Sequence, residues 1–380
     1  MTQDKQNNRP NVPPLRFSEF SGEWEKHLTT DFFEFKNGLN PDVKRFGSGT
    51  KFISVMDILN NRYITYDKII SAVEAKDDDL RDFGVNYGDI LFQRSSETLE
   101  DVGRANVYLD EKPALFGGFV IRGKRIGDYN PLFFRYLLSS PSVRKRIIVK
   151  GAGAQHFNIG QDGLSKVSLF VPSAKEQDRI AQLLNAIDKR IEVQSGLIEK
   201  LESLISGIIE RITAQSPNVR IADCLDCHSS TLQENQLNEA GGYRVYGANG
   251  ICGYTDNPGI NCDAILIVKD GSGVGNVSYA MGEYSVIGTS NYLTAKNGYS
   301  LRYLYFSLKK FNFAPYKTGM AIPHIYFKDY GKAKIYCPSL EEQERIANNL
   351  SKIERKIEIE RSIKDCCIVQ KQYLLQQMFI

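Results

Sequence analysis

Residues 175–192 read KEQDRIAQLLNAIDKRIE, and residues 341–358 read EEQERIANNLSKIERKIE. Nine of the eighteen aligned positions are identical, at a fixed offset of 166 residues. A Pro-Ser pair precedes both stretches at the same offset, at 172–173 and 338–339. One helix-like segment therefore occurs twice, which predicts that a single structural unit is repeated within the chain.

Both segments place apolar residues at alternating spacings of four and three, the pattern of a coiled-coil seam. The seam is interrupted once in each segment by a polar residue, which lowers stability but can fix the register of the pair. Packing of each helix on its own domain alone is the simpler alternative. Because a long globular region separates the segments, we expect the helices to pair antiparallel. The predicted seam is Ile180, Leu184, Ile187, Ile191, Gln194, Ile198, Leu201, Ile346, Leu350, Ile353, Ile357 and Glu360.

The rest of the chain divides into two regions of mixed character. Short β-rich runs such as DAILIV and VSLFVP are bounded by Gly, Asn and Asp, and each region has one amphipathic helix pattern, at 129–139 and 299–309. The predicted fold class is α+β: two similar mixed α/β domains, separated by two long helices that form an antiparallel coiled coil, with an internal pseudo-two-fold repeat. The predicted segments are a disordered lead-in at 1–14, domains at 15–174 and 217–338, and helices at 175–214 and 340–380.

The repeat continues more loosely inside the two domains. GDILF at 88–92 resembles CDAIL at 262–266, and VGR at 102–104 resembles VGN at 274–276. His156 aligns with His324 at an offset of 168, which requires one short insertion.

The bulk composition sets outer limits on function. The 380 residues include 42% apolar residues, enough for buried cores, and the net charge of +3 permits a nucleic-acid binder only if cations are segregated. The first residues are polar and Pro-rich, unlike a signal peptide, and no stretch approaches the ~20 apolar residues of a membrane span. An odd number of cysteines, seven, favours reduced thiols. We therefore expect a cytoplasmic protein.

Each domain has a zone with many cations, many Tyr and Phe, and few acids. Between 122 and 150 the only acid is Asp128, and between 296 and 334 it is Asp329. Phosphate contacts to DNA require such a local excess of positive charge, although a charged stretch is often only a solvated face. The cations are Arg122, Lys124, Arg125, Arg135, Arg144, Lys145, Arg146 and Lys150 in the first zone, and Lys296, Arg302, Lys309, Lys310, Lys317, Lys328, Lys332 and Lys334 in the second.

The sequence resembles the specificity (S) subunits of type I restriction-modification systems over nearly its whole length. The resemblance is carried by E-Q-x-R-I-A at 176–181 and 342–347, by GEWE at 22–25, and by YRVYGANGIxGY at 243–254. It implies two target recognition domains, each of which reads one half of a bipartite double-stranded DNA site. It also implies that the helices set the gap and dock two methyltransferase (M) subunits, with restriction and motor (R) subunits in the full complex.

Motifs for catalysis are absent from the sequence. NPLF at 130–133 lacks the second proline of an adenine methyltransferase motif, and GSGVG at 271–275 lacks the lysine of a phosphate-binding loop. A non-catalytic subunit is expected, with S-adenosylmethionine, ATP and Mg in partner subunits and no cofactor in this chain. Cys224, Cys227 and His228 resemble half of a zinc site, but Cys252 and Cys262 do not supply the second C-x-x-C, so no metal is expected.

The residues that contact DNA are predicted from two kinds of loop. Arg94, Arg104, Lys269 and Asn276 lie in or beside the loops after GDILF and CDAIL, and Arg and Asn suit base edges in the major groove. A coiled-coil scaffold for proteins and a free-standing restriction enzyme are the alternatives to the specificity subunit. The remaining candidates for DNA contact are Arg122, Lys124, Gln155, His156, Lys317 and His324.

Overall fold

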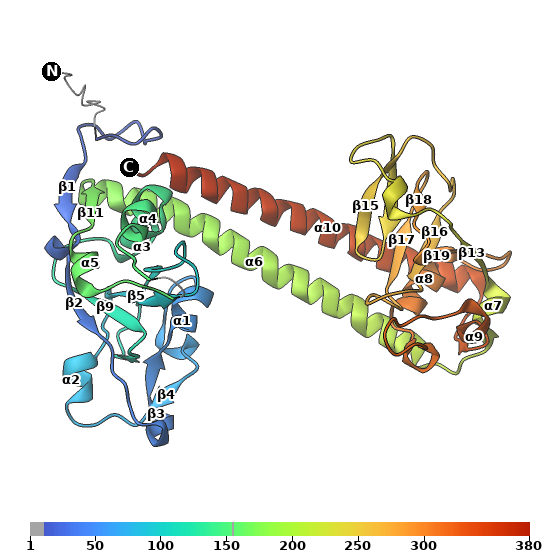
Figure 1. Cartoon of the computed structure of the whole chain (residues 1–380), viewed down its shortest axis with the longest axis horizontal. Coiled ribbons are helices and arrows are strands. Elements are labelled where there is room, and N and C mark those ends of the chain that lie inside the picture. Colours follow the sequence, from blue (N-terminus) through green and yellow to red (C-terminus); the bar gives the residue numbers. More distant parts are fainter. Residues whose placement is uncertain (1–10, 154–155) are drawn as a thin grey trace. The chain divides into compact units, whose positions relative to one another are not determined.

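The computed structural model describes residues 11–153 and 156–380. The chain forms two compact units, one of residues 1–194 with 363–380 and one of residues 195–362. Each contains a globular domain and one end of each of two long helices, α6 (Ala174–Thr213) and α10 (Leu340–Gln377) (Figure 1). In the described part of the chain, no helix is long and apolar enough to cross a membrane.

The first domain is built on a four-stranded antiparallel sheet with the order β2-β9-β5-β7. A second sheet, β4-β3-β8, lies in the same domain, and the core beside β5 is rich in aromatic side chains such as Phe33, Phe92 and Phe134. The elements are β1 (Glu25–Leu28), η1 (Thr29–Asp31), β2 (Phe33–Asn37), η2 (Val43–Arg45), β3 (Phe46–Ile53), α1 (Val55–Asn60), η3 (Tyr66–Lys68), β4 (Ala72–Val73), α2 (Asp79–Phe83), β5 (Ile90–Gln93), β6 (Ser95–Ser96), β7 (Ala105–Val107), β8 (Leu115–Phe116), β9 (Val120–Arg125), α3 (Pro131–Ser139), α4 (Pro141–Ile148), β10 (Phe157–Asn158), α5 (Gln161–Ser165) and β11 (Ser168–Val171).

The second domain has the same sheet order, β13-β19-β16-β17, with β15-β14-β18 as its second sheet. Its predicted amphipathic helix is α8, which packs on β16, β17 and β19. The elements are β12 (Val219–Arg220), α7 (Ile221–Cys224), β13 (Leu225–Ser229), η4 (Glu234–Gln236), β14 (Tyr243–Gly247), β15 (Gly250–Thr255), β16 (Ala264–Val268), β17 (Val277–Ala280), β18 (Ser285–Val286), β19 (Ser290–Ala295), α8 (Leu301–Lys309), η5 (Ala314–Tyr316), α9 (Phe327–Tyr330) and β20 (Lys334–Ile335).

Strand register fixes which residues of the two domains are equivalent. Gln93 pairs with Val120 in the first domain, and Val268 pairs with Ser290 in the second. The carbonyls of Gln93 and Val268 also accept from Gly103 and Gly275, so the offset in the central strand is 175, one residue more than the alignment of GDILF with CDAIL gives. The alignment of GDILF with CDAIL is therefore wrong by one residue. A slip of one residue matters because it would place every side chain on the opposite face of the sheet.

The two helices pack antiparallel within each unit, as predicted. In the first unit, Ile180 and Leu184 near the start of α6 share a core with Leu374 and Met378 near the end of α10. In the second unit, the start of α10 shares a core with the end of α6. All twelve predicted seam residues are buried or half-buried. The alternative, in which each helix packs on its own domain, also holds in part, because the same apolar faces contact the adjacent domains.

One contact that occurs in both halves of the repeat joins each helix start to its domain. Gln177 donates from Nε2 to the carbonyl of Pro172 at 3.0 Å and accepts from the backbone N–H of Asn130 at 3.0 Å, where α3 begins. Gln343 makes the same two bonds, to Pro338 at 2.9 Å and from Ser300 at 3.0 Å. The glutamine of E-Q-x-R-I-A therefore fixes the helix to the adjacent domain by satisfying backbone groups that would otherwise be unpaired.

Candidate nucleic-acid interface

The loop after the central strand has the same backbone frame in both domains. The N–H of Gly103 donates to the carbonyl of Gln93 at 2.9 Å, and that of Gly275 donates to Val268 at 2.9 Å. Both glycines have positive φ, 68° and 91°, a conformation that side chains disfavour. Arg104 and Asn276 follow these glycines and are exposed, so the predicted pair does occupy equivalent positions.

A short hairpin lies against this loop in each domain. In the first, Asn158 exchanges both backbone bonds with Ala152, and Ile159 donates to the carbonyl of Arg94 at 2.9 Å. In the second, His324 pairs with Thr318 in the same way, and Ile325 donates to the carbonyl of Lys269 at 2.9 Å. In each domain a backbone hydrogen bond thus joins the hairpin to the loop after the central strand.

These hairpins correct the alignment of the two histidines. The pairs Ala152–Asn158 and Thr318–His324 are related by an offset of 166, the offset of the helices. The equivalent of His324 is therefore Asn158, no insertion is needed, and His156 is not its counterpart. His156 is exposed, whereas His324 is half-buried with its Nδ1 3.1 Å from the carbonyl of Ile322.

Most of the other candidates are accessible at these loops or close to them. Arg94 is half-buried and donates to the carbonyl of Gly118 at 3.4 Å, while Arg104 forms an ion pair with Asp101 at 2.6 Å. Lys269 is half-buried. Lys124 and Lys317 are exposed, and Gln155 lies outside the described residues.

Arg122 is corrected by the structure and cannot serve as a DNA contact. Its side chain is 6% exposed, and its guanidinium donates to the carbonyl of Gly84 inside the domain. Burial lowers the pKa of Arg122 from its ordinary value because a charged group is stabilised less in a low-dielectric interior. A buried cation of this kind holds the loop at Gly84 rather than a phosphate.

Many cations of the cation-rich zones likewise have partners within the chain, in the domains or on the long helices. Arg144 donates to the carbonyls of Glu100, Val102 and Gly103 at 2.7–2.8 Å, and burial lowers its pKa to about 10. It therefore supports the loop that carries Arg104. Several other cations are paired with carboxylates or carbonyls: Arg125, Arg135, Arg146, Lys296, Arg302, Lys309 and Lys310.

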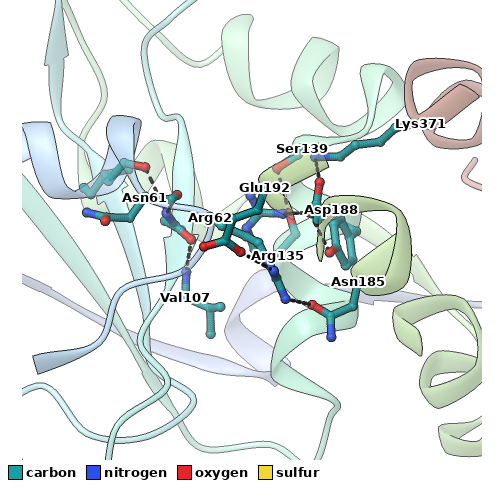
Figure 2. A network of polar contacts seen from close by, with 12 residues as sticks. Asn61, Arg62, Val107, Arg135, Ser139, Asn185, Asp188, Glu192 and Lys371 are labelled. Atoms are coloured by element: carbon teal, nitrogen blue, oxygen red, sulfur yellow. Dashed lines mark hydrogen bonds and ion pairs between the residues drawn. The ribbon is translucent and has the colours of Figure 1, made fainter. Parts of the chain in front are cut away.

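Where the first domain meets the helices, the buried acid Asp188 lies between Arg135 and Lys371 (Figure 2). Asp188 on α6 accepts from the hydroxyl of Tyr136 at 2.8 Å and pairs with Arg135 at 3.4 Å and with Lys371 of α10 at 2.6 Å. Glu354, at the offset of 166, occupies the same position in the second unit. Sequence patterns gave no signal for these contacts, because isolated charges on a helix are usually solvated.

The equivalent acid of the second unit also binds its own domain. Glu354 accepts from Arg302 at 2.6 Å and from Tyr305 and Lys309 at 3.2 Å each. Its side chain is 16% exposed against 7% for Asp188. Each helix pair is therefore fixed to the adjacent domain by a glutamine at the helix start and by an acid three turns further along.

The cysteine cluster does not form a metal centre in the described residues. Cys224 is buried, while Cys252 and Cys262 are exposed. Burial raises the pKa of the Cys227 thiol to about 11. Within residues 11–153 and 156–380, no three His, Cys, Asp or Glu side chains lie together in a way that could hold a metal ion.

The fold and the loops together define a class of protein. It has two similar mixed α/β domains, two long antiparallel helices, and in each domain one loop that is hydrogen-bonded to a hairpin. Residues 21–203 and 218–365 match the family described as the type I restriction modification DNA specificity domain. The chain belongs to this family.

Individual relatives agree with this assignment. The chain is 26% identical over 183 residues to the type I restriction enzyme EcoKI specificity subunit of Escherichia coli (strain K12), a match that covers 47% of this chain and 37% of that relative. Its fold is similar to that of a type I restriction-modification system S subunit from M. genitalium, with a TM-score of 0.69, 18% identity, and coverage of 97% of this chain and 99% of the other. A chain from a structure concerning complex assembly and conformational transition of the type I R-M system gives a TM-score of 0.53 at 14% identity, over 93% and 96%.

Proposed function

We propose that this chain is the sequence-specific DNA-recognition subunit of a type I restriction-modification complex. Each domain reads one half of a bipartite site in double-stranded DNA, and the helices set the gap and dock two methyltransferase subunits. The observation that supports this most strongly is the repeated frame of loop and hairpin, which presents Arg104 in one domain and Asn276 in the other. Arg and Asn are suited to bidentate contacts with base edges.

The chain itself carries out no chemistry in this proposal. Methylation and cleavage belong to M and R subunits, which would use S-adenosylmethionine, ATP and Mg. The purified chain alone should neither methylate nor cleave DNA. Methyl transfer by the isolated chain at a rate comparable to that of the complex would contradict the assignment.

Exchange of one domain tests the proposal directly. Residues 15–174 are replaced by the same region of another family member, and methylation sites are profiled in cells that also express the M subunits. One half of the recognised sequence should change and the other should remain. If both halves changed, the domains would not read DNA independently.

The remaining alternative is a coiled-coil scaffold for proteins without a DNA role. A salt titration of DNA binding by the complex separates the two. Phosphate contacts make binding fall steeply as salt increases. Binding that is absent, or insensitive to salt, would favour the scaffold.

A further inference from the structure

An arginine of the first domain, Arg62, binds the surface of α6. Arg62 follows α1, and its guanidinium donates to Glu192 at 2.8 Å and to Asn185 at 2.6 Å (Figure 2). The Arg62 side chain is 16% exposed and lies over the ring of Tyr63 at 5.0 Å. The segment that follows α1 thus contacts α6 through Arg62.

The same segment extends the edge of the sheet. Ile64 donates its N–H to the carbonyl of Val107 at 2.9 Å, and its own carbonyl accepts from Leu109 at 2.8 Å. The side chain of Asn106 donates to the carbonyl of Asn61 at 2.7 Å and holds the segment on β7. Arg62 therefore binds α6 through its charged side chain, and Ile64 binds the edge of the sheet through its backbone.

The second domain has no counterpart of this segment. After β3 the first domain continues into α1 and Arg62, whereas after β14 the chain turns back at once into β15. By strand register, Tyr279 and Met281 are equivalent to Val107 and Leu109. β17 is the edge of its sheet, and no strand in the described part of the chain pairs with its outer side.

An open cavity of about 600 Å³ lies beside this free edge. It is lined by Tyr279 and Met281 together with α8 and both helices, and the side chain of Met281 is 71% exposed. Glu358 lines it at the position equivalent to Glu192 and is exposed, with no ion pair among the residues that the structure describes. Arg302 already binds the equivalent of Asn185, which is Ser351, at 3.0 Å.

We propose that this cavity and the edge of β17 bind an extended segment of a partner protein, with an arginine two residues before an aliphatic residue. The aliphatic residue would add to the edge through the backbone of Tyr279 and Met281, and the arginine would pair with Glu358. Strand addition of this kind combines affinity from main-chain bonds with selectivity from a side-chain pocket. The geometry of residues 61–64 in the first domain supplies the template.

A fluorescent peptide with the sequence of residues 57–66, DILNNRYITY, is the probe. Titrated with the full chain, it should show saturable fluorescence anisotropy. Glu358→Gln should weaken binding about tenfold, since a charge-assisted bond to the arginine is lost. Glu344→Gln is the matched control, because Glu344 is exposed on the same helix and does not line the cavity.

Two altered peptides separate the side-chain and backbone contributions. In one peptide the arginine at the position of Arg62 is replaced by glutamine. In the other, the backbone N–H at the position of Ile64 is methylated. Each change should weaken binding about tenfold. The proposal is overturned if about 1 mM peptide shows no saturable binding, or if Glu358→Gln and both altered peptides bind as the parents do. The proposal would also be overturned if a scrambled peptide, or DNA at the same site, bound as well as the parent peptide. Salt-dependent DNA binding by the complex is independent of these outcomes.

Discussion

The first and second domains share a framework but differ in how they cover the helices. Both use a glutamine at the helix start, an acid three turns later, and a glycine-fixed loop beside a hairpin. Among the described residues, only the first places an arginine, Arg62, against the helix, whereas the second leaves the edge of β17 open. The difference indicates that the repeat keeps the contacts that orient each domain on its helix, while the segments around them vary.

The acids that join helix to domain should show the largest difference between the two units. Asp188→Ala removes the partner of three polar groups, among them two cations that are only 13% and 22% exposed, so we expect the free energy of unfolding to fall by about 3–5 kcal/mol. Glu354→Ala should cost only about 1–2 kcal/mol, because its partners are more exposed and can be solvated.

Urea unfolding of the full chain, followed by hydrogen exchange in each domain, measures both effects. Asp162→Ala is the control, since its ion pair with Lys166 is exposed and should contribute less than about 1 kcal/mol. Equal losses for Asp188→Ala and Glu354→Ala would mean that burial does not distinguish the two units.

The glutamines at the helix starts should behave alike, in contrast to the acids. Gln177→Ala and Gln343→Ala each leave a backbone N–H and a carbonyl unpaired, and each should cost about 1–3 kcal/mol. Gln182→Ala, at an exposed position on α6, should change stability by less than about 0.5 kcal/mol. A neutral effect of either replacement, in the same unfolding assay, would remove this contact from the shared framework.

Lengthening a helix tests whether the pair acts as a ruler between otherwise independent domains. Inserting one heptad after Gln194 keeps the seam in phase and adds ~10 Å. If α10 accommodates it, methylation profiling should show a gap longer by about three base pairs, with both half-sequences unchanged. Inserting two residues instead should break the seam and lower stability or activity. An active heptad variant with an unchanged gap would contradict the role of the helices.

The helices and their antiparallel pairing could be predicted because a heptad seam specifies a helical partner. The register of the central strands could not, because Ile90, Leu91 and Phe92 are all buried, and a run buried on both faces has no alternation to align. The alignment of His156 with His324 was wrong because it depended on a single matching residue. The backbone hydrogen bonds of the two hairpins show instead that Asn158 is equivalent to His324.

The candidate DNA residues were predictable only in part. Arg104 and Asn276 were found because short motifs precede them, and both lie exposed on the shared loop. Arg122 and Arg144 were counted as surface charge, yet both bind carbonyls inside the domain. Composition counts cations but does not show which of them find partners within the fold, and Arg62 had no pattern to mark it.

The measurement that tests the central claim most directly is methylation-site profiling of Arg104→Ala and Asn276→Ala in parallel. Both variants alter equivalent positions of the two loops, and each lost base contact should reduce discrimination by about 1–3 kcal/mol. We predict that Arg104→Ala relaxes one half of the recognised sequence, that Asn276→Ala relaxes the other, and that the gap stays constant. Relaxation of the same half by both variants, or of neither half in methylating complexes, would contradict the account of two equivalent and independent recognition loops.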